Sequence, residues 1–314
     1  MRILITGAAG FIGSHLADRL VADGHSVSGF DNLATGNMRN VNPDVDFWSC
    51  DVAEWGVCNA DLIIHCAASY SDPNDWHRDT RTNVVGTINM VRTAQQCGAR
   101  LFYFQTALCY GNNPRNQVEV TSIGGPREYV YIDGPVTTSA PLAPESSYAI
   151  SKTAGESYIR HSGVPYVSFR LANIYGPRNL SGPIPTFYRR LSRGETCTVV
   201  DSRRDFVYID DLVDLVMRVM DSDYVGVLHA ASGRDYSIRE LYDNVAGEFL
   251  NARLPIEIPR GPDDAATILL DPSETYERFG WKATTRLEIG IWEACAWYFE
   301  NEITDTYTHL ALRG

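Results

Sequence analysis

The sequence predicts an α/β protein with a doubly wound parallel sheet and a smaller, less regular second lobe. Short apolar strands alternate with helices through the first half of the chain, which is the order expected of a parallel sheet with helices on both faces. A glycine-rich turn joins the first strand to the first helix. The chain of 314 residues is long enough for two lobes around a large buried core.

In the first half, short apolar runs indicate strands and apolar residues at helical spacing indicate helices. The expected strands are 3–6, 26–30, 45–49, 62–67, 101–105 and 166–171. The expected helices are 11–23, 83–97 and 148–161.

The second half contains more helix and less strand. Helices are expected over 183–193, 209–220 and 287–300, and a buried strand over 226–231. A further helix, 237–250, begins at Ser237, because Ser237 and Glu240 have the spacing of a capping box. No internal repeat or low-complexity linker separates the halves, so we expect the two lobes to pack closely.

Residues 111–147 lack helical periodicity, and a structureless loop of that length is unusual inside a compact domain. Two β-rich segments, 118–123 and 128–132, flank Gly124-Gly-Pro-Arg127. They predict a β-hairpin within an insertion over 112–140.

Charge and composition argue against several classes of protein. The chain carries 39 acidic and 27 basic residues, a net charge of −12, which repels phosphate backbones and argues against a nucleic-acid partner. No apolar run is long enough to span a membrane, and the first strand begins too early for a signal peptide. The seven cysteines are scattered, without a C-x-x-C pair. We therefore expect reduced thiols, no metal site and a cytoplasmic location.

The turn Gly7-Ala-Ala-Gly10-Phe-Ile-Gly13 predicts a dinucleotide site in a Rossmann-type sheet. Gly7 and Gly10 allow a tight turn and the close approach of a pyrophosphate. Gly13 allows the helix to pack against the sheet. The helix N-terminus, which begins with Phe11 and Ile12, then faces the anion.

Two acidic residues follow later strands. Asp31 stands at the end of the second strand, 18 residues after Gly13. A carboxylate there accepts both hydroxyls of the adenosine ribose and repels a 2′-phosphate, so we expect NAD rather than NADP. Asp51 follows the third strand, where it either meets the adenine edge or is simply solvated.

Tyr148 and Lys152 are four residues apart on an expected helix and share one face. Free tyrosine has a pKa of about 10 and is a poor base, but a nearby lysine cation and a positive nicotinamide ring favour the phenolate. Tyr148 is therefore a candidate acid/base for a sugar or alcohol hydroxyl. Thr106, at a strand end, either hydrogen-bonds the same oxygen or satisfies local backbone.

These motifs resemble those of the extended short-chain dehydrogenase/reductase family, in particular its nucleotide-sugar epimerases and dehydratases. The resemblance runs nearly end to end. The similar segments are 6–13, Asp31-Asn-Leu-Ala-Thr-Gly36, His65-Cys-Ala-Ala68, 82–89, Thr106-Ala-Leu-Cys-Tyr-Gly111, 170–177 and 204–211. Segments 70–76, 106–110 and 182–187 look most like a subgroup from bacterial O-antigen biosynthesis, whose sugars are modified hexoses or uronic acids.

The resemblance implies a dinucleotide-binding domain over 1–176, to which 206–232 return, and a smaller, interleaved C-terminal substrate domain over 177–205 and 233–314. It implies NAD as cofactor, a nucleotide-diphosphate sugar as substrate, and a homodimer that pairs helices at about 83–97 and 148–161. The full set of expected cofactor-binding residues is Gly7, Gly10, Phe11, Ile12, Gly13, Asp31, Asn32, Thr35, Gly36, Asp51, Val52, Cys66, Ala67, Ala68, Asn83, Tyr148 and Lys152.

For the substrate, the resemblance implies that Thr106 holds the reacting oxygen and that Asn173 and Arg204 meet the diphosphate. Arg204 otherwise pairs with an acid such as Asp205. Arg260 lies one place from the family's second diphosphate arginine. Residues 199–204 are also shorter than the matching family segment, and the 42 residues from Thr106 to Tyr148 are more than the family usually has.

Two positions divide this family by reaction. Its 4,6-dehydratases and glucuronate decarboxylases follow the catalytic hydroxyl with Asp-Glu or Ser-Glu. Here the positions are Ala107 and Leu108, and neither side chain can move a proton. The resemblance therefore implies a nucleotide-sugar 4-epimerase with Thr106, Tyr148 and Lys152 as catalytic residues. The alternatives are a 4-ketoreductase or dehydratase of the same family and, from another class, a non-catalytic NAD-binding regulator.

Overall fold

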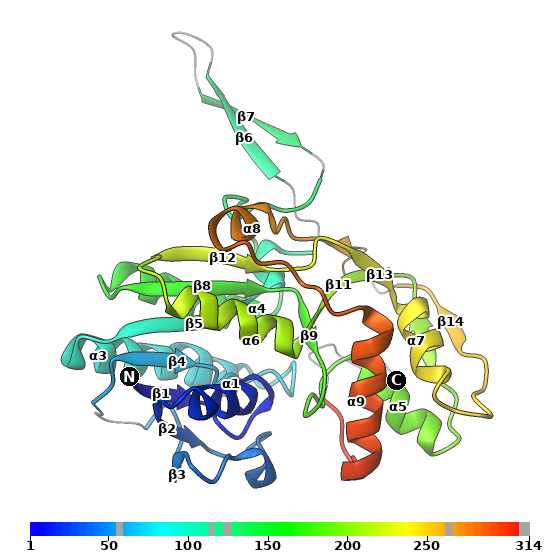
Figure 1. The fold of residues 1–314 in the computed structure, drawn as a ribbon. Helices are drawn as coiled ribbons and strands as arrows, with labels where there is room; N and C mark the ends of the chain where they lie inside the picture. The colour runs from blue at the N-terminus through cyan, green and yellow to red at the C-terminus, as the bar shows by residue number, and fades with distance from the viewer. Residues whose placement is uncertain are drawn as a thin grey trace.

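The central element is a parallel sheet of seven strands in the order β12-β8-β5-β4-β1-β2-β3 (Figure 1). The computed structural model describes residues 1–54, 59–112, 116–121, 127–132, 134–260, 265 and 267–307. All neighbours in the sheet run parallel. The doubly wound fold predicted from the sequence is confirmed. The strands are β1 (Arg2–Thr6), β2 (Ser26–Asp31), β3 (Asp46–Ser49), β4 (Leu62–His65), β5 (Arg100–Thr106), β8 (Tyr166–Leu171) and β12 (Gly226–Ala230).

Helices cover both faces of this sheet. In Figure 1, α1 (Phe11–Ala22) and α6 (Ile209–Met220) lie in front of it, and α3 (Thr87–Cys97) and α4 (Ser147–His161) lie behind. Successive side chains of a strand point to opposite faces. Ile3 and Ile5 of β1 accordingly belong to the core beneath α1 and α6, and Leu4 belongs to the second core with Met90 of α3. Burial on both faces explains why the strands are apolar throughout.

The expected start of the helix at residue 83 was wrong. Helical structure begins with α2 (Trp76–Asp79), continues as a π-helix, η2 (Thr80–Gly86), and only then becomes α3. Asp75 caps the first turn, since its side chain accepts the amide of Arg78 at 3.0 Å. A polar cap and tertiary contacts fix this start of the helix. The prediction depended on apolar periodicity, which these residues lack, so it placed the start too late.

The second lobe lies at the carboxyl ends of the central strands (Figure 1, right). Its main sheet has four strands, in which β11 (Arg203–Tyr208) pairs with β9 (Asn173–Tyr175), β13 (Asp235–Ser237) and β15 (Thr267–Ile268). A further parallel pair is β10 (Thr198–Val200) with β14 (Ile256–Ile258). The helices are α5 (Pro183–Ser192), α7 (Ile238–Ala246), α8 (Ser273–Phe279) and α9 (Leu287–Asn301). The capping box of Ser237 and Glu240 is confirmed.

The insertion before α4 contains the predicted hairpin. β6 (Asn116–Thr121) pairs antiparallel with β7 (Arg127–Ile132), and Figure 1 shows the pair projecting away from the body of the molecule above α8. The turn predicted at Gly124–Pro126 lies outside the described residues. After the hairpin the chain returns to the body, where Val136 forms a bridge with Leu270.

Two short 3₁₀ helices, η1 (Met38–Asn40) and η3 (Ala107–Tyr110), follow β2 and β5 respectively. Across the described residues, none of the helices is both long enough and apolar enough to cross a bilayer.

Candidate active site

The predicted site residues gather at one edge of the central sheet. Gly7, Cys66 and Thr106 lie at or just after the ends of β1, β4 and β5, and Asp31 is the last residue of β2. The strand order reverses between β1 and β4, and ligands of open α/β sheets bind outside the carboxyl ends of the strands at such a reversal.

Gly7 and Gly13 of the glycine-rich turn leave no room for a side chain. Gly7 has a φ of +69°, and a Cβ there would lie 2.8 Å from the amide nitrogen of Ala67. A Cβ on Gly13 would lie 2.2 Å from the carbonyl oxygen of Gly7. The first turn of α1, with Phe11 and Ile12, has no side-chain cap, so its amide groups are suited to an anion. This arrangement fits the pyrophosphate of NAD.

Asp31 ends β2 with a largely buried carboxylate, which accepts the amides of Ala9 and Leu33 at 3.2 and 2.7 Å. Burial raises the pKa of this carboxyl group. A Cβ on Gly36 would lie 2.8 Å from the Asp31 carboxylate, so the loop after β2 folds directly over it. Asn32 in this loop is exposed, and Thr35 hydrogen-bonds the hydroxyl of Tyr70.

The segment Cys66-Ala67-Ala68 after β4 lies against the glycine turn. The amide of Ala67 donates to the Thr6 hydroxyl at 3.0 Å, and Thr6 Oγ1 lies 2.7 Å from Nδ1 of the buried His65. Burial lowers the pKa of His65 to about 3, so the ring is neutral. The buried side chains of Thr6 and His65 thus fix the backbone of Ala67 at the reversal of strand order.

Asn83 extends this network towards α4. Its amide pairs with the backbone of Ser69 at 2.9 and 3.0 Å and donates to Ser151 Oγ at 3.0 Å. Asp51, by contrast, accepts the amide of Ala53 at 2.8 Å and has its carboxylate 3.6 Å from Arg81. Val52 is buried, and its carbonyl accepts the side chain of Asn89.

Lys152 is 2% exposed and lies inside the site. Burial lowers the pKa of its ammonium to about 7, although Cys66 and Glu156 oppose the shift. Tyr148 lies one helical turn earlier on α4. Burial raises the pKa of its phenol well above the usual range, with further contributions from Tyr70 and Asp79. The rings of Tyr70 and Tyr148 meet edge to face at 6.3 Å between centroids.

Thr106 is joined to α4 through a buried chain of polar contacts. Its amide donates to the side chain of Gln105 at 2.8 Å, and Gln105 donates to Glu156 at 3.1 Å. Glu156 also pairs with the buried Arg170 at 3.0 Å. The Thr106 hydroxyl accepts the amide of Leu108 at 3.2 Å, as the backbone-satisfying alternative expects. The link through Glu156 was not predicted from the sequence, although the i,i+4 spacing of Glu156 from Lys152 was a usable signal.

The predicted diphosphate ligands Asn173 and Arg204 lie on the paired strands β9 and β11, in which Asn173 stands opposite Phe206, two residues after Arg204. The Asn173 amide donates to the carbonyl of Asp205 at 3.1 Å, and the Arg204 guanidinium donates to the carbonyls of Arg203 and Ala265. The carboxylate of Asp205 instead accepts the amides and hydroxyl of the 232–233 turn. Arg260 is exposed, in the segment between β14 and β15.

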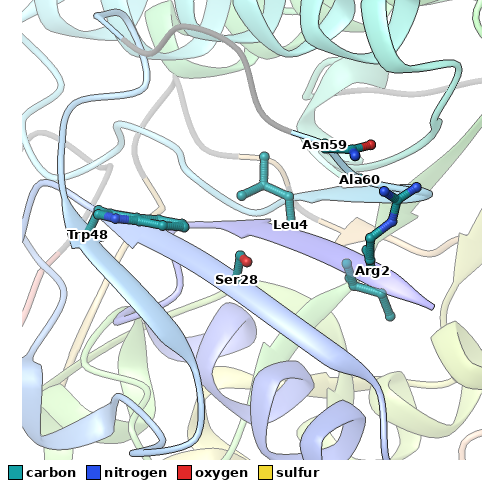
Figure 2. A pocket seen from close by; sticks show the side chains of 7 residues that line it. Arg2, Leu4, Ser28, Trp48, Asn59 and Ala60 are labelled. Atoms are coloured by element: carbon teal, nitrogen blue, oxygen red, sulfur yellow. The ribbon is translucent and has the colours of Figure 1, made fainter.

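Two cavities differ in their relation to this site. A cavity of about 20 Å³ lies beside the candidate base Tyr148 and is lined by Tyr70, Asp79, Ser147 and Tyr148, among others. A larger one of about 120 Å³, shown in Figure 2, is lined by Leu4, Ser28, Trp48 and their neighbours on the β1–β2–β3 part of the sheet. None of the predicted site residues lines the larger cavity. Among the residues that the structure describes, no His, Cys, Asp or Glu cluster could hold a metal ion.

Comparison with known proteins agrees with this geometry. Residues 3–236 match the NAD dependent epimerase/dehydratase family. The chain is 31% identical to a UDP-glucose 4-epimerase of Mycolicibacterium smegmatis, over 93% of this chain and 96% of that protein. It is 30% identical to UDP-glucuronic acid decarboxylase 1 of Danio rerio, over 96% of this chain and 73% of that protein.

Solved structures show the same fold. Bordetella bronchiseptica WbmH in complex with NAD⁺ is 41% identical, with a TM-score of 0.86, over 96% of this chain and 99% of that one. B. bronchiseptica WbmG in complex with NAD and UDP is 36% identical, with a TM-score of 0.84, over 100% and 99%. These matches confirm the predicted family and the prediction of NAD as its cofactor. The chain therefore belongs to the NAD dependent epimerase/dehydratase family.

Proposed function

We propose that this protein is a nucleotide-sugar 4-epimerase that acts through a transient 4-keto sugar. The observation that carries the proposal is the position of Thr106 at the end of β5, next to Ala107 and Leu108 of η3 and linked through Glu156 to the helix of Tyr148 and Lys152. The site holds a proton acceptor for one hydroxyl, and the two positions after Thr106 hold no second acid or base. Such a site suits oxidation and reduction at one carbon.

In the proposed mechanism, Tyr148 takes the proton from the 4-hydroxyl and returns it to the same oxygen after the sugar has turned over. Thr106 hydrogen-bonds that oxygen. Lys152 binds the cofactor ribose and favours the phenolate. Bound NAD supplies the hydride acceptor and then the hydride donor. Since the same hydride returns to C4, the reaction needs no added reductant.

The proposal also includes the cofactor-binding and substrate-binding roles that the sequence predicts. The glycine turn, Asp31 and the segment after β4 bind the cofactor. Asn173, Arg204 and Arg260 bind the diphosphate, and the lobe formed by 177–205 and 233–314 binds the rest of the substrate. The family resemblance supports a role in bacterial polysaccharide biosynthesis, and the scattered cysteines support a cytoplasmic location.

We also propose a homodimer that pairs the η2–α3 segment and α4. Ile150 and Tyr158 are 53% and 49% exposed on one face of α4, and Val85 of η2 is 43% exposed. Two turns separate Ile150 from Tyr158, so they form one apolar stripe. Pairing with the same stripe of a second copy covers it.

The alternative reactions require catalytic groups or a cofactor supply that differ from those of an epimerase. A decarboxylase or dehydratase needs an acid or base that moves carbon-bound protons, and positions 107 and 108 provide neither. A 4-ketoreductase uses the same Tyr148 and Thr106 but consumes a reduced cofactor at each turnover.

The deciding experiment is proton NMR of the purified, NAD-loaded protein with UDP-, dTDP-, GDP- and CDP-sugars in D₂O. We expect a new axial–equatorial coupling pattern at C4 without deuterium on carbon, and we expect Tyr148→Phe to abolish it while retaining NAD. Deuterium at C3 or C5 contradicts the proposal, since it requires enolisation. Turnover that begins only when NADH or NADPH is added identifies the reductase.

A further inference from the structure

Asp79 is a buried carboxylate that binds both segments of the chain around the candidate base. It is 1% exposed at the end of α2. One oxygen accepts the hydroxyl of Ser69 at 2.9 Å, and the other accepts the hydroxyl of Ser147 at 2.7 Å. Acceptance by both oxygens is the pattern of an ionised carboxylate, and the N-terminus of α4 favours its charge.

The two serines are sequence neighbours of the two tyrosines that meet in the site. Ser69 precedes Tyr70, Ser147 precedes Tyr148, and the rings of these tyrosines meet edge to face. Asp79 therefore holds the backbone of both partners of this aromatic contact through a single side chain.

Asn83, four residues after Asp79, makes a second tie between the same segments. It binds the backbone of Ser69 on one side and Ser151 Oγ on the other, and Ser151 donates to the carbonyl of Tyr148 at 2.9 Å. The segment that contains Asp79 and Asn83 thus clamps the Tyr70 loop against the first turns of α4. Asn83 is neutral, so only Asp79 adds charge to the clamp.

The charge of Asp79 acts on the phenol. The titratable groups that act on Tyr148 are Tyr70 from the loop after β4, Asp79 from α2 and Tyr103 from β5. The ammonium of Lys152, on the same helix as Tyr148, lies over the Tyr103 ring. Asp79 contributes to the raised pKa of Tyr148, after burial and Tyr70. The cavity of about 20 Å³ that Tyr70, Asp79 and Tyr148 line has room for about one water molecule.

We propose that Asp79 is the positioning residue of Tyr148, and that it fixes the phenol against Tyr70 and keeps the proton on the phenol until cofactor and substrate are bound. This inference rests on the proposed function of Tyr148 as acid/base. It assigns two separable effects to one side chain. The hydrogen bonds to the serines set the position of the phenol, and the negative charge sets its protonation.

Two substitutions separate the effects. Asp79→Asn keeps side-chain hydrogen bonds but removes the charge, and Asp79→Ala removes both. Asp44→Asn is the matched control, because it removes one charge from an exposed residue that does not line the cavity beside Tyr148. All are assayed as NAD-loaded, full-length protein, for kcat and kcat/KM as functions of pH.

We expect Asp79→Asn to move the acidic limb of the kcat/KM profile to lower pH by about one unit, with kcat on the plateau within about threefold of wild type. The sign follows because loss of a nearby negative charge makes the phenolate easier to form. Asp79→Ala gives the same displacement and, in addition, a fall in kcat of about tenfold or more. Asp44→Asn leaves the profile where it is. An unmoved limb in Asp79→Asn, or an equal displacement in Asp44→Asn, overturns the proposal.

A second readout does not depend on turnover. The tyrosinate absorbance of each NAD-loaded protein is titrated with pH, and the signal of the matching Tyr148→Phe variant is subtracted. We expect the Tyr148 titration in Asp79→Asn to lie about one pH unit below that of the wild type, and coincident titrations refute the inference. If Tyr148→Phe retains turnover, the proposed function fails, while this titration still decides whether Asp79 controls the phenol.

Discussion

Lys152 and Tyr103 contact each other in two ways. The Nζ of Lys152 lies 3.9 Å from the centroid of the Tyr103 ring, and the Tyr103 hydroxyl donates to the carbonyl oxygen of Lys152 at 2.9 Å. A face of aromatic π density attracts an ammonium but replaces only part of its hydration. The charge on this lysine therefore costs stability in the absence of a bound partner, and that cost is measurable.

The first prediction concerns pH and stability. The pKa of Lys152 is about 7 in the folded protein and about 10.4 in an unfolded chain. Between these values the unfolded chain binds more protons, so stability rises with pH. Relative to Lys152→Met, we expect the wild-type free energy of unfolding to rise by about 1 kcal/mol for each pH unit from 7 to 9. Urea unfolding at pH 7, 8 and 9 measures it. Lys282→Met, at an exposed lysine, retains Lys152, so its free energy of unfolding should change with pH as that of the wild type does. If the free energy of unfolding of Lys152→Met also changes with pH in the same way, the prediction is contradicted.

The second prediction concerns the glycine turn. Gly13→Ala places a methyl group where the Gly7 carbonyl lies 2.2 Å away, and we expect a loss of about 1–3 kcal/mol of stability together with loss of bound NAD. Gly247→Ala serves as control, because its φ is −59° and its nearest contact would be at 3.3 Å. Thermal unfolding and the NAD released on denaturation are the measurements. Wild-type NAD content in Gly13→Ala would show that the turn rearranges to admit a side chain.

The third prediction concerns the buried ion pair of Glu156 and Arg170, whose side chains are 1% and 3% exposed. Arg170→Met leaves the Glu156 charge buried without its partner, which we expect to cost about 3–5 kcal/mol. Adding Glu156→Met removes the stranded charge and should restore part of that stability. The double-mutant cycle is measured by urea unfolding. Strict additivity of the two single changes would mean that the pair contributes nothing as a pair.

The fourth prediction concerns assembly. If α4 forms the dimer contact, Ile150→Glu combined with Tyr158→Glu places charge in the interface and yields a monomer in light scattering after gel filtration. Phe299→Glu is the control, since Phe299 is 77% exposed on α9, outside the proposed interface. Retention of a dimer by the α4 variant, or its loss in the α9 variant, would move the interface elsewhere.

The sequence was most informative where one local signal determines the structure. Apolar runs predicted every strand of the central sheet, because burial on both faces requires continuous apolar strands. Helical periodicity predicted most of the helices that cover the sheet. The glycine turn and Asp31 were identified because backbone approach and strand ends constrain residue type at fixed offsets. Tyr148 and Lys152 were paired because helical spacing places them on one face.

Tertiary structure alone decided how these pieces are joined. Asp79 contacts Ser147, 68 residues further along the chain, and Gln105 contacts Glu156 across 51 residues. No spacing rule relates residues so far apart, because such contacts form only when α4 packs against the sheet. Tertiary packing also explains why the helical segment begins at α2, before the predicted start. The side-chain cap and the buried Asp79 stabilise α2, which lacks the apolar periodicity that marks other helices. The sequence by itself thus determined the sheet, the glycine turn and the face of α4 that Tyr148 and Lys152 share, whereas the environment of Tyr148 depends on long-range packing that local patterns do not encode.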